Sequence, residues 1–127
     1  MSGHILVVDD EAPTRELLSI YFRNRGFTVT ALENPKEALR VLGEQAVQVV
    51  ILDIDLGTAS GLDLLQPMKK AKPDVPIILF SGMGLDEEAV RAAQEKGAAG
   101  YLHKTQPLHQ MWAEVQRVLA TPPTVGH

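Results

Sequence analysis

Three aspartates follow two of the hydrophobic runs in this sequence. Asp9 and Asp10 come directly after one run, and Asp53 comes directly after another. If the fold brings these carboxylates together, their like charges repel one another strongly in a partly dry site. A hard divalent cation relieves that repulsion, and Mg²⁺ prefers oxygen ligands and often shares phosphate oxygens with its protein site. The three aspartates therefore indicate a site for Mg²⁺ or, as a substitute, Mn²⁺.

Two further polar residues follow hydrophobic runs later in the chain. Ser81 ends one such run and offers a hydroxyl, and Lys104 ends the next and offers a mobile ammonium on a long stem. A divalent cation, an ammonium and a hydroxyl around one carboxylate are what a phosphoryl group in transfer requires, because each binds or neutralises a different oxygen. In this arrangement Asp53 is the nucleophile and the product is an acyl phosphate.

The hydrophobic runs read as strands, and the segments between them read as helices. Continuous rather than alternating hydrophobicity is typical of strands that are buried on both faces. The expected strands cover 5–8, 27–32, 47–52, 77–80 and 99–103. Helical spacing of apolar residues is clearest in the first helix, expected over 14–25, and in the last. Their expected buried stripes are Leu17, Leu18, Tyr21 and Phe22, and Leu108, Met111, Trp112, Val115 and Leu119.

This alternation of strands and helices predicts an α/β fold. Strand–helix–strand units imply right-handed crossovers and a parallel sheet with helices on both faces. Ligands bind such sheets at the carboxyl ends of the strands. In the strand order 2-1-3-4-5, strands 1, 3, 4 and 5 are adjacent, so that the polar residues at their ends converge on one crevice.

Composition excludes several classes of protein. With 127 residues, 45% of them hydrophobic and 22% charged, the chain fits a single domain with a real core. The net charge of −4 argues against a direct nucleic-acid ligand. The absence of cysteine excludes disulfides and thiolate chemistry. No apolar run approaches the ~20 residues that span a bilayer, so we expect no membrane partner and a cytoplasmic location.

Four spaced motifs resemble the receiver domain of two-component response regulators, in the CheY-like superfamily. They are Val7-Val8-Asp9-Asp10-Glu11, Ile51-Leu52-Asp53-Ile54-Asp55-Leu56 with Gly61 eight residues after Asp53, Leu79-Phe80-Ser81-Gly82, and Gly97-Ala98-Ala99-Gly100-Tyr101-Leu102-His103-Lys104. The resemblance covers almost the whole chain. It implies a flavodoxin-like (βα)5 doubly wound sandwich, with a five-stranded parallel sheet in the order 2-1-3-4-5.

The resemblance also implies residue roles. Asp53 is the implied phosphoacceptor, and Mg²⁺ is held by Asp9, Asp10, Asp53 and the main-chain carbonyl of Asp55. Lys104 binds the phosphoryl group. The implied switch pair is Ser81 and Tyr101: the serine is drawn toward the phosphate, and the tyrosine occupies the space that it leaves.

The implied partners belong to a phosphorelay. A sensor histidine kinase or a histidine phosphotransfer protein supplies the phosphoryl group from a phosphohistidine, and slow autodephosphorylation resets the domain, which is otherwise no enzyme. An output domain, another partner or a second copy would bind the face formed by the fourth helix, fifth strand and fifth helix. We expect an N-terminal extension over 1–4, the receiver domain over 5–120 and a disordered tail over 121–127. The sequence holds no output domain, and a stand-alone regulator and a fragment both fit it.

Three positions depart from the family pattern. Thr105 stands where members often have a proline in a cis peptide, which leaves the conformation of the Lys104–Thr105 peptide open. A loop is expected over Gly57 to Gly61, before the third helix; Gly57 stands there where a proline is usual, and gives this loop more backbone freedom. Asp55 is acidic where many members are neutral. We hypothesise that its charge tunes the lifetime of the phosphorylated state.

Two other functions remain open. Asp53-Ile54-Asp55 matches the nucleophile-plus-acid spacing of haloacid dehalogenase-type phosphatases, although that family places the pair after its first strand and usually needs a longer chain. The other alternative is a degenerate receiver that docks partners without phosphorylation. Taken singly, an acid after a strand is often only a helix-terminal carboxylate; the joint pattern favours the phosphoacceptor.

Overall fold

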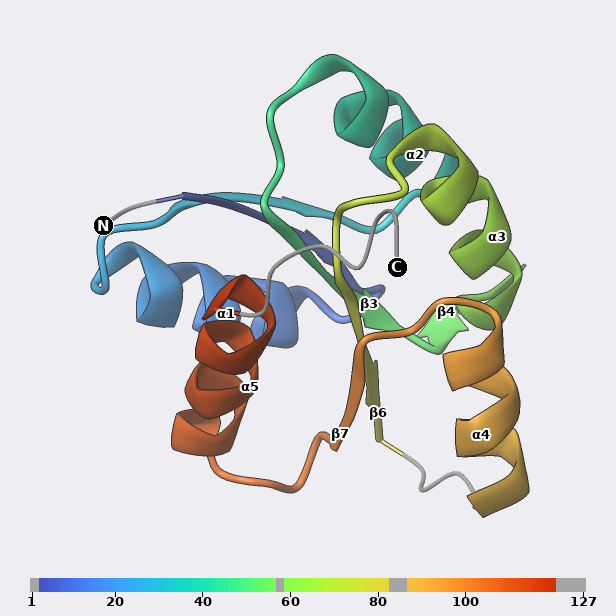
Figure 1. Cartoon of the computed structure of the whole chain (residues 1–127). Coiled ribbons are helices and arrows are strands. Elements are labelled where there is room, and N and C mark those ends of the chain that lie inside the picture. The colour runs from blue at the N-terminus through green and yellow to red at the C-terminus, as the bar shows by residue number, and fades with distance from the viewer. Residues whose placement is uncertain (1–2, 57–58, 83–86, 121–127) are drawn as a thin grey trace.

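The computed structural model describes residues 3–56, 59–82 and 87–120. Helices and strands alternate along the chain (Figure 1). In chain order they are β1 (His4–Val8), α1 (Ala12–Arg23), β2 (Thr28–Leu32), α2 (Pro35–Glu44), β3 (Val49–Asp53), β4 (Asp55–Leu56), β5 (Ala59–Ser60), α3 (Leu62–Ala71), β6 (Ile77–Ser81), α4 (Glu87–Glu95), β7 (Gly100–His103) and α5 (Leu108–Ala120).

The main sheet has five parallel strands in the order β2-β1-β3-β6-β7. This confirms the predicted order 2-1-3-4-5, because β6 and β7 are the fourth and fifth strands of that sheet. Every residue of β3 and β6 is buried. Their hydrophobicity is continuous because helices cover both faces of the sheet.

Two apolar clusters form the core, one on each face of the sheet. On one face α2, α3 and α4 pack through residues such as Leu42, Leu65 and Ala93. On the other face α1 and α5 pack through residues such as Phe22 and Val115. Figure 1 shows the same division, with α1 and α5 side by side. This three-layer arrangement leaves the two ends of the sheet accessible to ligands.

Local sequence signals explain where α1 begins and ends and where α2 begins. Pro13 occupies the first turn of α1, where a missing N–H costs nothing. After α1, Gly26 has φ +89°, and the Phe27 N–H donates to the Phe22 carbonyl at 3.1 Å, as in a Schellman motif. Asn34 caps α2, because its side chain accepts hydrogen bonds from two backbone N–H groups of the first turn.

Two of the predicted stripe residues are exposed. Leu17 is 52% exposed and Leu119 is 40% exposed. In α1, Leu18 and Phe22 lie four residues apart and pack against the sheet. Leu17 lies about 100° from Leu18 around the helix axis, so it points away from the sheet. In α5, Val118 is buried in place of Leu119, for the same reason. The predicted helices are therefore present, although α1 begins and ends two residues earlier than the predicted 14–25, and each predicted buried stripe includes one exposed leucine.

The predicted loop before the third helix contains a small hairpin. β4 and β5 pair antiparallel, with Asp55 opposite Ser60. Gly57 lies outside the described residues. Beyond the hairpin, α3 includes Pro67 in its interior, where a proline removes a backbone hydrogen bond. The hairpin follows directly after β3 and therefore lies beside Asp53, at the carboxyl edge of the main sheet.

The ends of the domain differ slightly from expectation. β1 begins at His4, which was assigned to the N-terminal extension; the rest of that extension includes residues 1 and 2, which are not described. The tail over 121–127 also lies outside the described residues. The Lys104–Thr105 peptide is trans, since the described residues contain no cis peptide bond. None of the helices in the described part is long and apolar enough to cross a membrane.

Candidate functional site

The predicted functional residues meet at the carboxyl edge of the main sheet. Asp9 follows β1, Asp53 ends β3, Ser81 ends β6 and Lys104 follows β7. The register makes these positions neighbours: Val8 pairs with Leu52 and Asp53 with Phe80, and the Ser81 carbonyl accepts from the Lys104 N–H at 2.7 Å. Parallel pairing is what places strand ends far apart in the sequence at one edge.

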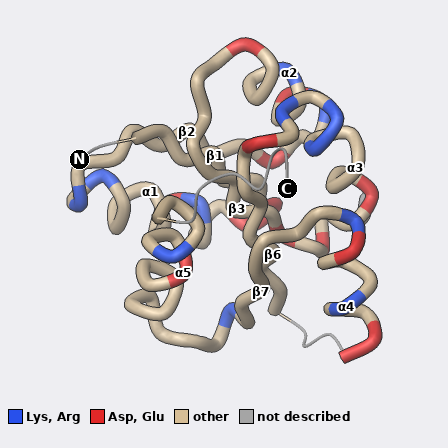
Figure 2. The backbone as a smooth tube through the Cα atoms, viewed as in Figure 1, with Lys and Arg blue, Asp and Glu red and all other residues tan. Residues whose placement is uncertain are grey.

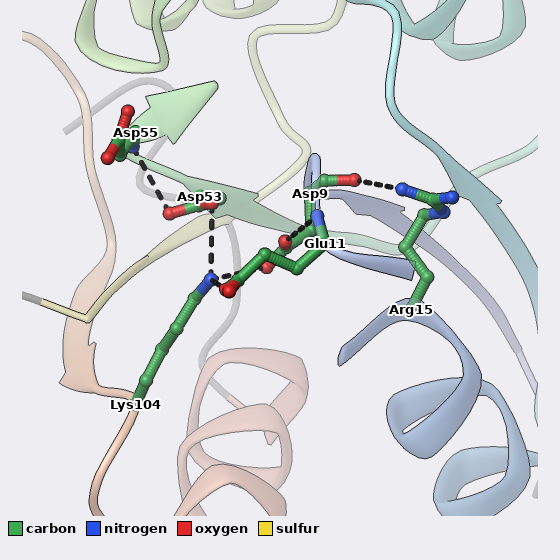
Figure 3. A network of polar contacts seen from close by, with 6 residues as sticks. All are labelled: Asp9, Glu11, Arg15, Asp53, Asp55 and Lys104. Atoms are coloured by element: carbon green, nitrogen blue, oxygen red, sulfur yellow. Dashed lines mark hydrogen bonds and ion pairs between the residues drawn. The ribbon is translucent and has the colours of Figure 1, made fainter. Parts of the chain in front are cut away.

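The Lys104 ammonium contacts three carboxylates at this edge (Figure 3). Lys104 Nζ lies 2.9 Å from Asp9 Oδ2, 3.2 Å from Asp53 Oδ2 and 2.6 Å from Glu11 Oε1. The Asp9 and Asp53 side chains are almost completely buried, whereas the Glu11 side chain is 59% exposed. The lysine therefore bridges the buried carboxylates and one carboxylate at the mouth of the site.

Backbone groups fix the two buried aspartates. The Glu11 N–H donates to Asp9 Oδ1 at 2.8 Å, and the Asp55 N–H donates to Asp53 Oδ1 at 3.1 Å. From α1, the Arg15 guanidinium donates to the Asp9 carbonyl oxygen at 2.8 Å. Each carboxylate thus has one oxygen held by the main chain and a second oxygen directed toward Lys104.

Asp9, Asp10 and Asp53 could together hold a metal ion. Each offers a carboxylate oxygen, and these oxygens lie within 4.8 Å of one another. Asp9 Oδ2 is buried and accepts no hydrogen bond of good geometry, although the Lys104 ammonium lies 2.9 Å away as an ion-pair partner. An acceptor of this kind, in a set of oxygen ligands alone, fits a hard cation such as Mg²⁺.

Burial and mutual repulsion shift the ionisation of these groups. Burial, together with the charge of Asp9, raises the pKa of Asp53 from 3.8 to about 6. Burial also raises the pKa of Asp9. For Lys104 burial acts to lower the pKa, but the contacts with Glu11, Asp9 and Asp53 outweigh it and raise the pKa. The cluster of acids is therefore electrostatically strained, and the ammonium remains charged.

The remaining predicted site residues lie around this centre. Ser81 is buried at the end of β6, and Tyr101 is half-buried on the neighbouring strand, opposite Leu79. Tyr101 packs against the apolar cluster beneath α2, α3 and α4. The Asp55 side chain is exposed and lies two residues after Asp53, the phosphoacceptor candidate. Whether Ser81 and Tyr101 act as a switch pair, and whether the Asp55 carbonyl binds a metal, remain predictions.

One glycine is required by a close backbone approach beside Asp53. A Cβ atom on Gly61 would lie 2.0 Å from the Asp53 carbonyl oxygen, a distance at which the backbone has to move. The Gly61 N–H donates to the Ile54 carbonyl at 2.6 Å and closes the hairpin back onto the end of β3. Steric exclusion of a side chain thus explains why glycine occupies the position eight residues after Asp53.

Sequence reasoning did not assign Glu11 and Arg15 to the site. Glu11 belongs to the first motif, Val7 to Glu11, but no role in the site was predicted for it, although it contacts Lys104. Arg15 supports the main chain at Asp9. A signal was present in the sequence: Glu11 directly follows Asp9 and Asp10, and Arg15 lies four residues further on, in the first turn of α1.

The chain matches the family model for the response regulator receiver domain over residues 5–116. Among curated proteins it is 35% identical to the regulatory protein VirG of Agrobacterium fabrum, over 97% of this chain and 48% of the relative. The chain therefore spans about half the length of that relative.

Two solved structures add to this likeness. The receiver domain of NtrX from Brucella abortus is 31% identical, with a TM-score of 0.85, and the match covers 92% of this chain and 98% of that one. A response regulator from Burkholderia pseudomallei is also 31% identical, with a TM-score of 0.82, covering 90% of this chain and 66% of that one. The Burkholderia structure contains a phosphorylated aspartic acid, a calcium ion and citrate.

Proposed function

Since the chain belongs to the response regulator receiver domain family, we propose that Asp53 accepts a phosphoryl group from a phosphohistidine in a Mg²⁺-dependent reaction. The observation that carries this proposal is the Asp53 carboxylate, buried at a strand end, 3.2 Å from the Lys104 ammonium and beside two further aspartates. The phosphorylated aspartic acid and the calcium ion in the Burkholderia relative support it.

In the proposed reaction an Asp53 carboxylate oxygen attacks the phosphorus. A P–O bond forms, the P–N bond of the phosphohistidine breaks, and the imidazole leaves with the electron pair. Lys104 binds a transferred phosphoryl oxygen and neutralises part of its charge. Ser81 donates its hydroxyl to another oxygen. The step is a transfer between two side chains, so the domain turns over no separate substrate except its own acyl phosphate, which water slowly hydrolyses.

Asp9, Asp10 and Asp53 would hold Mg²⁺, with the Asp55 main-chain carbonyl as an additional ligand. Bound there, the cation would offset the negative charge of the aspartates and of the incoming phosphoryl group. Their oxygen-only chemistry and close spacing support this assignment. Mn²⁺, which accepts the same ligands, would substitute.

The proposed signal leaves the site through Ser81 and Tyr101. Ser81 moves toward the phosphoryl group, and Tyr101 takes the space that opens between β6, β7 and α4. The position of Tyr101 supports this role, because Tyr101 lines a groove together with Val90 and Gln94 of α4 and Glu114 of α5. Local charge thereby biases a two-state packing of the α4–β7–α5 face.

The proposed partners follow from this chemistry. A sensor histidine kinase or a histidine phosphotransfer protein donates the phosphoryl group, and an output domain, another partner or a second copy binds the α4–β7–α5 face. Neither nucleic acid nor a membrane is a proposed direct partner. Lys and Arg are interspersed with Asp and Glu along the backbone (Figure 2), and the net charge of −4 does not favour binding to phosphate backbones. A cytoplasmic location remains a prediction.

The test is phosphorylation by acetyl phosphate, followed by intact-protein mass spectrometry. We expect one added phosphoryl group on the wild type in the presence of Mg²⁺, none without Mg²⁺, and no stable adduct on Asp53→Asn. A Lys104→Ala variant should still bind Mg²⁺ but fail to repack the α4–β7–α5 face. Persistent labelling of Asp53→Asn would contradict the assignment, and an unlabelled wild type would favour a docking module that works without phosphorylation.

A further inference from the structure

We infer that Glu11 is a positioning residue for Lys104: it holds the ammonium at the mouth of the site until a phosphoryl group competes for it. The inference rests on the proposed function, because it concerns regulation of the same site. Of the three carboxylates that contact the ammonium, Glu11 is the nearest, at 2.6 Å, compared with 2.9 Å for Asp9 and 3.2 Å for Asp53.

Glu11 differs from the other two carboxylates in its position. Its side chain is 59% exposed, whereas those of Asp9 and Asp53 are 1% and 2% exposed. Its main chain is nevertheless attached to the buried cluster, because the Glu11 N–H donates to Asp9 Oδ1 at 2.8 Å. Figure 3 shows the Glu11 side chain reaching from this anchor to the end of Lys104. Glu11 is therefore placed to hold the ammonium without belonging to the buried acids.

This position gives Glu11 opposite effects on a cation and on an anion. A divalent cation that enters the cluster competes with the ammonium for Asp9 and Asp53. The ammonium then retains Glu11 as its partner, so that Glu11 favours the exchange. A phosphoryl group, in contrast, needs the same ammonium, and Glu11 competes with the phosphoryl oxygens for it. Glu11 should therefore strengthen cation binding and weaken phosphoryl binding.

The test measures both affinities in Glu11→Gln, which has nearly the same shape and no charge. By titration calorimetry we expect Mg²⁺ affinity to fall about twofold to fivefold, and affinity for beryllofluoride, a phosphoryl-like anion, to rise about twofold to fivefold at saturating Mg²⁺. This range is that of an ion pair with one exposed partner. Glu16→Gln is the matched control, because it removes the same charge from an exposed position of α1.

Two further variants separate the contact from charge alone. Glu11→Asp keeps the charge but is one methylene shorter, so we expect it to raise beryllofluoride affinity as Glu11→Gln does. The second is Glu11→Gln in a Lys104→Ala background. The double variant should have the same beryllofluoride affinity as Lys104→Ala alone, because the competition acts through the ammonium.

The results that would overturn the inference are specific. They are equal shifts in Glu11→Gln and Glu16→Gln, wild-type behaviour of Glu11→Asp, or a Glu11→Gln effect that persists without Lys104. A wild type that binds neither Mg²⁺ nor beryllofluoride would overturn the inference and the proposed function together. A wild type that binds both, with Glu11→Gln behaving as the control does, would overturn the inference alone.

Discussion

At the Asp53 carboxylate, two effects on its charge oppose each other. Burial and the charge of Asp9 raise the pKa to about 6, while the Asp55 N–H and Lys104 favour the ionised form. The environment of Asp53 therefore stabilises the protonated acid relative to the carboxylate. A carboxylate in this state is poorly solvated, and a bound cation would stabilise its charged form.

This balance predicts a pH-dependent effect of Asp53→Asn on stability. The folded-state pKa, about 6, exceeds the ordinary value of 3.8, so ionisation of Asp53 costs stability progressively as pH rises from about 4 to about 6. With EDTA at pH 7, Asp53→Asn should raise the free energy of unfolding by roughly 1–3 kcal/mol. Urea unfolding at pH 4 and pH 7 measures this, and the gain should nearly vanish at pH 4.

The control for this experiment is Asp63→Asn, which removes an exposed carboxylate from α3. It lacks the buried environment of Asp53 and should not stabilise the protein at pH 7. An Asp53→Asn variant no more stable than the wild type at pH 7 would contradict the assigned electrostatic cost.

Asp55 provides a second prediction at the residue scale. Its exposed carboxylate lies two positions after Asp53 and would repel a phosphoryl group on that residue. Asp55→Asn should therefore slow autodephosphorylation, by about twofold to tenfold for an interaction near 1 kcal/mol. The decay of the acyl phosphate, followed by mass spectrometry after removal of acetyl phosphate, gives the rate. An unchanged rate would end the hypothesis that Asp55 tunes this lifetime.

Among the elements, α1 links the core to the site. Leu18 and Phe22 bury one face of the helix against the sheet. Glu11, the residue before α1, contacts Lys104, and Arg15 in its first turn donates to the Asp9 carbonyl. Packing of the buried face therefore sets where these polar side chains lie. The exposed Leu17 lies on the same helix but outside this packing.

The two leucines of α1 should respond differently to truncation. Leu18 is 1% exposed and Leu17 is 52% exposed. We expect Leu18→Ala to cost about 2–4 kcal/mol of unfolding free energy, because it leaves a cavity in the core, and Leu17→Ala to cost less than about 1 kcal/mol. Chemical denaturation compares the two variants directly. Equal losses would mean that α1 packs on the sheet through a different face.

At the scale of the whole molecule, the parallel sheet gathers acidic groups from separate strands into one cluster. Because only the folded chain assembles this cluster, a cation that binds it stabilises the fold. Binding of this kind adds about 2.7 kcal/mol at a ligand concentration one hundred times the dissociation constant.

Mg²⁺ should therefore raise the melting temperature of the wild type in a concentration-dependent way. Asp10→Asn should reduce this response, since Asp10 is exposed and its removal spares the core while taking one oxygen ligand from the cluster. Differential scanning calorimetry at constant ionic strength measures the effect. If Asp10→Asn responds to Mg²⁺ as the wild type does, Asp10 is not a ligand.

Much of the fold and of the candidate site could be predicted because it depends on local patterns. Continuous hydrophobic runs identified the strands, and the polar residues that end them, such as Asp53 and Lys104, followed without tertiary information. The misassigned residues, Leu17 and Leu119, lie at the border of a helical stripe, where spacing alone does not say how the helix is rotated on the sheet. The hairpin after Asp53 was missed because strands of two residues leave no periodic signal.

By itself the sequence determined the order of the elements and the chemistry at the strand ends, since both follow from residue type and periodicity. Only the tertiary structure decided that Glu11 joins the charges that meet at these strand ends. Glu11 and Lys104 are 93 residues apart in the chain, and their contact exists because β1 and β7 end at the same edge of the sheet. Burial likewise decided the raised pKa of Asp53. Contacts and burial depend on distances across the fold, which residue spacing along one strand or helix does not contain.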